Sequence, residues 1–195
     1  MHSYERHILR KLARGEKSRY SNLRPEGAES NLFIYHLKKL IREGLIRKAE
    51  SGYALTAAGN RYIDKLSLAS FTPRFQPKIV TVIVAKNKQG VYLLWKRARQ
   101  PFLGLCAFPY GKIHFGETIR GAAARELHEK TGLGARLAHR GDVYLTVYVR
   151  EELIVHMLCH VFTATKITGA LQAKTEYGQC MWADPKRFSE KEFIP

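Results

Sequence analysis

The chain has 195 residues, a length that suits two modest domains better than one. Its hydrophobic fraction of 45% and charged fraction of 26% are ordinary for a globular protein and exclude wholesale disorder. The net charge of +16 favours a polyanionic partner, either nucleic acid or a phosphate-rich ligand, with a merely basic surface as the alternative. Residues 1–70 and the remainder are both basic, at +7 and +9.

The three cysteines, Cys106, Cys159 and Cys180, lack metal-site spacing, and the N-terminal stretch is charged and amphipathic where a signal peptide needs an apolar core. We therefore expect a reduced, cytoplasmic setting. No apolar run approaches the roughly 20 residues that span a bilayer, so membrane insertion is not expected.

The first seventy residues show helical periodicity. Apolar residues recur at helical spacing in Tyr4–Ala13, and Arg19–Leu23 predicts a short second helix. The strongest signal is Ser30–Glu43, where one stripe is apolar, Ser30 is the predicted N-cap and Gly44 suits the left-handed C-terminal position. These patterns predict three helices.

A short hairpin is predicted next. Leu45–Glu50 and Tyr53–Thr56 are strand-like runs on either side of the Ser51-Gly52 turn, and Thr56 then caps another helical stretch. The run Tyr35–Ile46 with this hairpin resembles the winged-helix domains of bacterial and archaeal transcription regulators over nearly all of residues 1–70.

The resemblance implies that Ser30–Glu43 is a recognition helix and that the hairpin is the wing. Basic and polar side chains on such a helix meet phosphates and base edges in DNA. RNA binding, and a protein-contact, dimerisation or structural role, are the alternatives. The residues expected to face DNA are Asn31, Tyr35, Lys38, Lys39 and Arg42 on the helix, with Arg47 and Lys48 at the wing.

A change of character follows at Ser67–Gln76, which has no clean period. We place the linker at 71–78, between a first domain of 1–70 and a second of 79–195. Ile79–Ala85 and Val91–Trp95 are β-rich runs around a turn-forming cluster and are predicted to pair as a hairpin. Further strand-like runs occupy 142–149 and 154–164.

The segment from Gly111 to Leu133 is the most informative. Thr118–Thr131 predicts an amphipathic helix ended by Gly132, with Ile119, Ala122, Ala123 and Leu127 turned inward. Glu126 and Glu129 lie three residues apart on one helical face, an arrangement that can hold a hard cation such as Mg²⁺ and suits diphosphate chemistry. An ordinary charged surface helix is the alternative, but it leaves the loop spacing unexplained.

This segment resembles the Nudix box. Gly111, five residues, Glu117, seven residues and then Arg125-Glu126-Leu127-x-Glu129 match the box, and Lys130 stands where it has a further glutamate. Segments 108–112 and 182–185 extend the resemblance across about 75–195. It implies an α+β chain whose second domain is a Nudix α/β/α sandwich, a mixed sheet with helices on both faces.

The resemblance also implies roles for the residues of the box. Glu126 and Glu129 would approach Mg²⁺ or Mn²⁺, and Arg125 would pair with Glu117 to hold the loop against the helix. The Lys130 ammonium cannot ligate a metal while it is charged, and it repels the cation.

Two hypotheses about Lys130 follow. In the first, its ammonium takes part of the space of the cation and binds phosphate directly, so that ligand binding persists without hydrolysis. In the second, a rearranged site with Glu176 as a third ligand beside Glu126 and Glu129 keeps the enzyme active. His114 and His128 are expected on the surface, because neither has a partner at metal-ligand spacing.

For ligand recognition the sequence offers arginines for a diphosphate and aromatics for a base, although core packing explains the aromatics equally well. The expected ligand-binding residues are Arg97, Arg99, Gly111, Lys130 and Tyr148, with Tyr144 and Phe162 as further aromatic candidates.

The leading functional hypothesis is a homodimeric DNA-binding regulator whose Nudix domain binds a nucleoside-diphosphate-linked metabolite with weak or no hydrolysis. This arrangement resembles regulators that also combine a Nudix-like sensor with a winged helix, but in the reverse domain order. The second hypothesis is a Mg²⁺-dependent Nudix hydrolase of nucleoside diphosphates linked to another group, with an accessory winged helix. RNA-end processing is a third.

Overall fold

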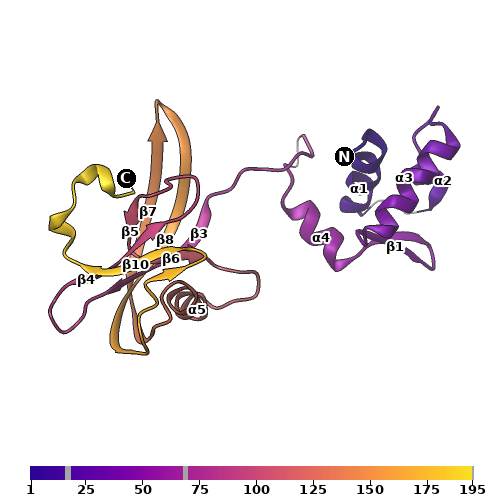
Figure 1. The fold of residues 1–195 in the computed structure, drawn as a ribbon. Coiled ribbons are helices and arrows are strands. Elements are labelled where there is room, and N and C mark those ends of the chain that lie inside the picture. Colours follow the sequence, from indigo (N-terminus) through magenta and orange to yellow (C-terminus); the bar gives the residue numbers. More distant parts are fainter. Residues whose placement is uncertain (16–18, 68–69, 195) are drawn as a thin grey trace. The chain divides into compact units, whose positions relative to one another are not determined.

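The computed structural model describes residues 1–15, 19–67 and 70–194. The chain divides into two compact units, Met1–Phe75 and a second that begins at Gln76. Helices and a hairpin form the first unit, and a mainly β structure forms the second (Figure 1). The fold class is therefore α+β, as predicted. None of the helices described has both the length and the apolar character required to cross a membrane.

The first unit follows the predicted order of three helices, a hairpin and a further helix. Thr56 caps the last helix as expected, because its hydroxyl accepts a hydrogen bond from the backbone N–H of Gly59 at 3.0 Å. The elements are α1 Ser3–Ala13, α2 Tyr20–Leu23, α3 Ser30–Arg42, β1 Ile46–Ala49, β2 Gly52–Leu55 and α4 Ala57–Asp64.

Helix α3 is central to this unit. Phe33, Leu37 and Leu40 are buried on its apolar stripe against α1 and the hairpin. The predicted N-cap is wrong by one residue: the backbone N–H of Phe33 already donates to the Glu29 carbonyl, so Ser30 lies inside the first turn. Gly44 adopts the expected left-handed conformation, with φ of 71°.

The end of the first unit extends into the expected linker. The Phe71 side chain is buried in the core of this unit, with the Arg10 guanidinium 5.4 Å from its ring centroid. The backbone N–H of Arg74 donates to the Lys65 carbonyl at 3.0 Å and folds the chain back on α4. Residues 71–75 therefore belong to the first unit because an aromatic side chain anchors them.

The second unit contains two four-stranded sheets. One has the strand order β6-β3-β8-β7 and the other β5-β4-β10-β9. In the first, β3 runs parallel to β8, while β7 and β8 form a long antiparallel hairpin that extends beyond the other strands (Figure 1). The strands are β3 Lys78–Ala85, β4 Tyr92–Arg97, β5 Cys106–Ala107, β6 Tyr110–Lys112, β7 Gly134–Val149, β8 Glu152–Thr168, β9 Lys174–Thr175 and β10 Gly178–Ala183.

The predicted β3–β4 hairpin is wrong, because these strands belong to different sheets. Next to the turn, an isolated bridge pairs Lys86 with Tyr92, but β4 then pairs with β10 and β5 and not with β3. Leu93, Leu94 and Trp95 are consecutive and all buried. Both faces of β4 are therefore covered, which a strand in a one-sided hairpin would not require.

Helix α5, Ile119–Thr131, packs against β3, β6 and β7. The helix begins one residue later than predicted, because Thr118 is its N-cap, and Gly132, with φ of 71°, ends it as predicted. Ala122, Ala123 and Leu127 are buried as expected, but Ile119 is 40% exposed because it lies in the first turn, at the edge of the contact.

The expected helices on both faces are not found. Among the described residues from 76 to 194, α5 is the one α-helix, and the segment after β10 forms two short 3₁₀ turns, Pro185–Arg187 and Glu190–Glu192. The backbone N–H of Ile194 donates to the Cys106 carbonyl at 2.9 Å. With the isolated bridge between Cys106 and Phe193, this bond joins the end of the segment to β5.

Candidate functional site

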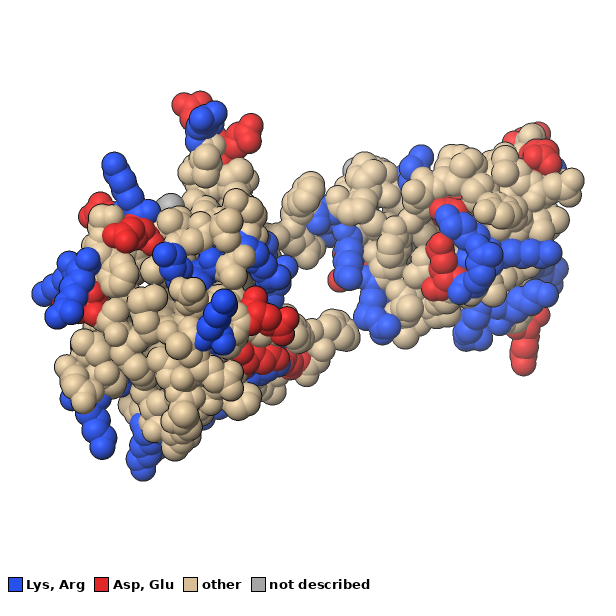
Figure 2. Space-filling view, in the orientation of Figure 1, with Lys and Arg blue, Asp and Glu red and all other residues tan. Residues whose placement is uncertain are grey.

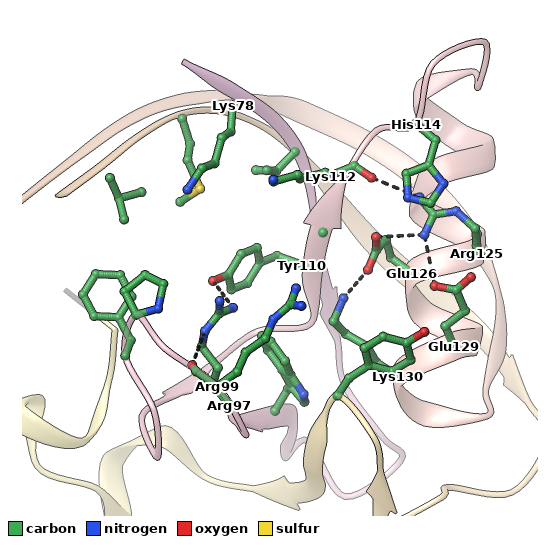
Figure 3. A pocket seen from close by; sticks show the side chains of 18 residues that line it. Lys78, Arg97, Arg99, Tyr110, Lys112, His114, Arg125, Glu126, Glu129 and Lys130 are labelled. Carbon is green, nitrogen blue, oxygen red and sulfur yellow. Dashed lines mark hydrogen bonds and ion pairs between the residues drawn. The ribbon is translucent and has the colours of Figure 1, made fainter. Parts of the chain in front are cut away.

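A cavity of about 300 Å³ lies in the second unit between the strands and α5 (Figure 3). Carboxylates of α5 form one side, and basic side chains of the strands form another. Six lysine and arginine side chains and two glutamates line it, so the cavity favours an anionic ligand. The lining residues are Lys78, Val80, Trp95, Arg97, Arg99, Pro101, Phe102, Tyr110, Gly111, Lys112, His114, Arg125, Glu126, Glu129, Lys130, Val155, Met157 and Tyr177.

Glu126 is the buried carboxylate of this cavity, with 5% of its surface exposed. A Cβ on Gly111 would stand 1.8 Å from its carboxyl carbon, so only glycine permits this close approach of β6 to α5. Arg125 Nη1 donates to one oxygen at 2.9 Å, and Lys130 Nζ forms a short ion pair with the other. Both oxygens of Glu126 therefore contact cationic groups.

Lys130 projects from α5 into the cavity with 7% of its surface exposed (Figure 3). Its Nζ lies 5.1 Å from the ring centroid of Trp95 and 5.6 Å from that of Tyr177, within cation–π range. Burial lowers the pKa of Lys130, and its ion pair with Glu126 only partly offsets this effect. The rings of Trp95 and Tyr177 thus help to hold the Lys130 ammonium against Glu126.

The expected ion pair between Arg125 and Glu117 is present. Two guanidinium nitrogens contact the two carboxylate oxygens at 2.6 and 2.9 Å, and the backbone N–H of His114 donates to Glu117 at 2.8 Å. The Arg125 hydrogen bonds, with that of His114, lower the pKa of Glu117 to about 2. Arg125 also reaches Glu129 at 3.1 Å, so it joins the loop before α5 to the carboxylates of the helix.

The opposite side of the cavity is basic. Arg97 donates to the Tyr110 hydroxyl at 3.1 Å and to the Arg99 carbonyl at 2.8 Å, which fixes its guanidinium beside the cavity (Figure 3). Burial, followed by repulsion from Lys112 and Arg97, lowers the pKa of Lys78. Cations that repel one another at a cavity wall are suited to a multiply charged anion such as a diphosphate.

The structure brings some of the expected ligand residues together and leaves others apart. Arg97, Arg99 and Lys130 all line the cavity. Glu176, expected as a third metal ligand, is exposed in the turn between β9 and β10 and does not line it. Tyr148 is 60% exposed, because the β7–β8 hairpin carries it past the cavity.

Several lining residues were missed by sequence reasoning. Lys78 and Lys112 come from β3 and β6, and they become neighbours only because Val80 pairs with Lys112 across these strands. Tyr177 follows β9, and its ring lies 5.6 Å from Lys130 Nζ on α5. Their identities carry no local signal, since strand pairing alone brings them together.

Mg²⁺ and Mn²⁺, the cofactors expected from the sequence, do not fit the carboxylates as they lie. Arg125 and Lys130 contact the two oxygens of Glu126, and Arg125 also contacts Glu129. A divalent cation would have to displace the Lys130 ammonium from Glu126 against charge repulsion. The donor set therefore favours an ammonium over a metal ion.

The expected DNA-facing residues of the first unit lie mostly on its surface. Asn31, Tyr35, Lys38 and Arg42 are exposed on α3, and basic side chains gather over this part of the unit (Figure 2). Lys39 differs from expectation, because its Nζ pairs with the buried Glu5 carboxylate at 2.9 Å. Arg47 and Lys48 are exposed on β1.

Comparisons with known proteins agree with the fold of the second unit. The NUDIX domain family matches residues 75–194. An ADP-ribose pyrophosphatase of Methanocaldococcus jannaschii is 32% identical over 126 residues, which cover 62% of this chain and 72% of that protein.

Solved structures show the same fold at lower identity. A MutT NUDIX hydrolase of Burkholderia pseudomallei is 22% identical with a TM-score of 0.50, over 60% of this chain and 94% of that one. The NUDIX domain of Shewanella oneidensis NrtR, solved with ADP ribose, is 21% identical with a TM-score of 0.50, over 68% and 86%. The box residues in and before α5, the two sheets and the family match over residues 75–194 agree with one another. The chain therefore belongs to the Nudix family.

Proposed function

We propose that the chain is a ligand-responsive DNA-binding regulator. Its Nudix unit binds a nucleoside-diphosphate-linked metabolite with little or no hydrolysis. One observation carries this proposal: the Lys130 ammonium is buried against the Glu126 carboxylate, where the family places a metal ion. An internal cation can contact phosphate oxygens, but it cannot supply a metal-activated water.

The cavity supports a diphosphate ligand. Arg97 and Lys78 offer cationic donors on one side, and Lys130 offers another beside α5. Trp95 and Tyr177 add aromatic surface next to Lys130. ADP-ribose is the first candidate, because the Methanocaldococcus relative is named an ADP-ribose pyrophosphatase and the Shewanella neighbour was solved with ADP ribose.

Calorimetry tests this binding directly. ADP-ribose is titrated into the full chain with EDTA present, and we expect metal-independent binding that Arg97→Ala weakens by about 10-fold or more, because a charge-assisted contact contributes about 1.5–3 kcal/mol. Arg187→Ala removes the same charge outside the cavity and should bind like the natural chain. Binding that appears only with Mg²⁺ would contradict the proposal.

The DNA-binding half rests on the first unit. Asn31, Lys38 and Arg42 are exposed along α3, and the adjacent hairpin carries Arg47 and Lys48. An exposed, basic helix followed by a basic hairpin suits a major groove flanked by phosphates. We propose that this unit is a winged helix, that α3 is its recognition helix and that the protein acts as a homodimer on paired half-sites.

Fluorescence anisotropy with duplex DNA tests this half. Affinity should fall steeply as salt rises, and a Lys38→Ala/Arg42→Ala variant should lose affinity and give a shallower salt slope. Lys65→Ala, an exposed basic site outside α3 and the hairpin, should change the slope little. Light scattering on the same samples reports whether a dimer forms. Equal slopes in all three proteins would exclude α3 as the DNA contact.

A Nudix hydrolase is the second candidate. Its support is the 32% identity to the Methanocaldococcus protein, named a pyrophosphatase, together with the retained Glu117, Arg125, Glu126 and Glu129. Chromatography of ADP-ribose incubated with Mg²⁺ separates the candidates. Product formation by the natural chain would establish the hydrolase, whereas product formation only by Lys130→Glu would support the regulator.

A further inference from the structure

Three potential metal ligands meet on the β7–β8 hairpin, outside the cavity. The Asp142 Oδ1 atom lies 2.8 Å from His139 Nε2 and 2.7 Å from His160 Nδ1. All three ligand atoms lie within 4.8 Å of one another. The His160 side chain is 12% exposed, while those of His139 and Asp142 are 44% and 46% exposed, so the cluster is anchored in the sheet and open to solvent.

A β-bulge brings His139 and Asp142 to the same side of β7. Residues three apart in a regular strand point to opposite faces, but the register shifts between His139 and Gly141, so that one extra residue stands in β7. Gly141 has φ of 146°, a conformation that other residues rarely adopt. Asp142 pairs directly with His160 across the ladder.

We propose that His139, Asp142 and His160 form a binding site for a borderline divalent metal ion, with Zn²⁺ as the reference ion. Two imidazole nitrogens and one carboxylate oxygen suit Zn²⁺ better than Mg²⁺ or Ca²⁺, which prefer oxygen ligands. Water completes the coordination, since the cluster is open to solvent. The ion links β7 to β8 where β8 also pairs with β3.

Two of the three separations between ligand atoms require only a small adjustment, and the two histidine nitrogens, which lie within 4.8 Å of each other, complete the set. Zn–N and Zn–O bonds of about 2.0–2.2 Å place ligand atoms about 3.3 Å apart in a tetrahedral site. The nitrogen-to-oxygen distances of 2.7 and 2.8 Å would therefore open by roughly half an ångström. The His139 ring packs 5.3 Å from the buried Phe162 ring, which limits its rotation.

Arg140, the cation next to the cluster in sequence, points away from the three ligands. Arg140 is the extra residue of the bulge, and its Nε donates to Thr163 Oγ1 at 2.9 Å. Thr163 lies three residues beyond His160 on β8, where the pairing with β3 is regular, so it faces the other side of the sheet. The guanidinium is thereby held away from the three ligands.

Calorimetric titration of the tag-free full chain with Zn²⁺ tests the site, with Co²⁺ absorption as a second readout. We expect one strong equivalent per chain and Co²⁺ bands typical of four-coordination. Asp142→Asn and His160→Ala should each weaken Zn²⁺ binding by about 10-fold or more, because even an outer-shell partner is commonly worth 10-fold. Tryptophan fluorescence melts check that these variants fold.

Two controls separate this site from others. His156→Ala removes a histidine four residues away on the same strand, which contacts the Tyr144 hydroxyl, and it should keep the strong equivalent. Glu126→Gln/Glu129→Gln should keep it also, because the Nudix carboxylates are not involved. Zn²⁺ binding that is absent in the natural chain, or unchanged in both Asp142→Asn and His160→Ala, would overturn the proposal.

Discussion

Lys130 and Glu126 neutralise each other in a part of the cavity where each is more than nine-tenths buried. Breaking a buried pair by removing one member costs up to about 3–5 kcal/mol, and here Glu126 would keep only its contact with Arg125. The pair therefore stabilises α5 only while it is intact. Replacing Lys130 with a carboxylate therefore tests whether a metal ion can take the place of the ammonium.

Lys130→Glu should lower the thermal midpoint of the second unit in EDTA, because two carboxylates then face each other. Added Mg²⁺ should restore the midpoint, since a divalent cation can now bridge Glu126 and the new side chain. The natural chain should show no Mg²⁺-dependent shift. Trp95 and Trp182 both lie in the second unit, so tryptophan fluorescence follows its unfolding.

Lys174→Glu supplies the matched control, because it makes the same charge change at an exposed position on β9. Its midpoint should not respond to Mg²⁺. A Mg²⁺-dependent rise in the natural chain would show instead that the ion displaces Lys130 from Glu126, and would strengthen the hydrolase candidate.

At the scale of elements, Glu5 joins α1 to α3. Its carboxylate accepts hydrogen bonds from Lys39 at 2.9 Å and from the backbone N–H of His2 at 3.0 Å, and it lies 2.8 Å from His36 Nδ1. Burial alone would raise the pKa of Glu5, but the bonds from Lys39, His36 and His2 outweigh it and lower the pKa to about 2. The helices are thus held by a carboxylate that must stay ionised.

The lowered pKa predicts an acid-sensitive first unit. Because the folded pKa of Glu5 lies below its unfolded value of 4.5, its contribution, about 3 kcal/mol, is complete above pH 4.5 and is lost as the pH falls toward 2. Glu5→Gln should lower the free energy of unfolding at pH 7 and flatten its fall in acid. Urea unfolding followed by circular dichroism at 222 nm measures this, since most helix is in the first unit.

Glu29→Gln is the comparison for that experiment, because Glu29 is exposed and makes no side-chain cap. Its unfolding free energy should follow the natural chain at every pH. If Glu5→Gln and the natural chain instead lost stability in parallel between pH 4.5 and 2, Glu5 would not be the source of the acid sensitivity.

Sequence reasoning located the elements whose signals are local. The apolar stripe and Gly44 located α3 to within one residue, and the amphipathic pattern with Gly132 did the same for α5. Contacts between strands could not be predicted in this way. The separate sheets of β3 and β4 depend on partners far away in the chain, and the meeting of His139 with His160 depends on a bulge that no periodicity reveals.

In the candidate site, too, contacts within one element could be predicted and contacts between elements could not. Glu126, Glu129 and Arg125 share one helix, so their spacing alone predicts that they lie close together. The contact between Gly111 and Glu126 joins a strand to a helix, and glycine at that position is explained only by the missing space for a Cβ. Tyr148 was expected near the ligand because an aromatic side chain suits a base, whereas the β7–β8 hairpin carries it past the cavity.

For the whole molecule, the regulator proposal requires the two basic units to communicate. If ADP-ribose changes the affinity for DNA by some factor, DNA must change the affinity for ADP-ribose by the same factor, because coupling free energy is reciprocal. Couplings of this kind are commonly about 5- to 150-fold. Anisotropy titrations give the factor by which ADP-ribose changes the affinity for DNA. Calorimetric titrations give the factor by which DNA changes the affinity for ADP-ribose, and we expect the two factors to be equal.

Arg97→Ala makes this test specific. The variant should bind DNA with the affinity of the ligand-free natural chain and should show no response to ADP-ribose, because the substitution lies in the Nudix cavity and leaves α3 intact. Equal DNA affinities with and without saturating ADP-ribose in the natural chain would mean that the units act independently. The first unit would then serve to localise a Nudix protein on nucleic acid, and the ligand would not regulate DNA binding.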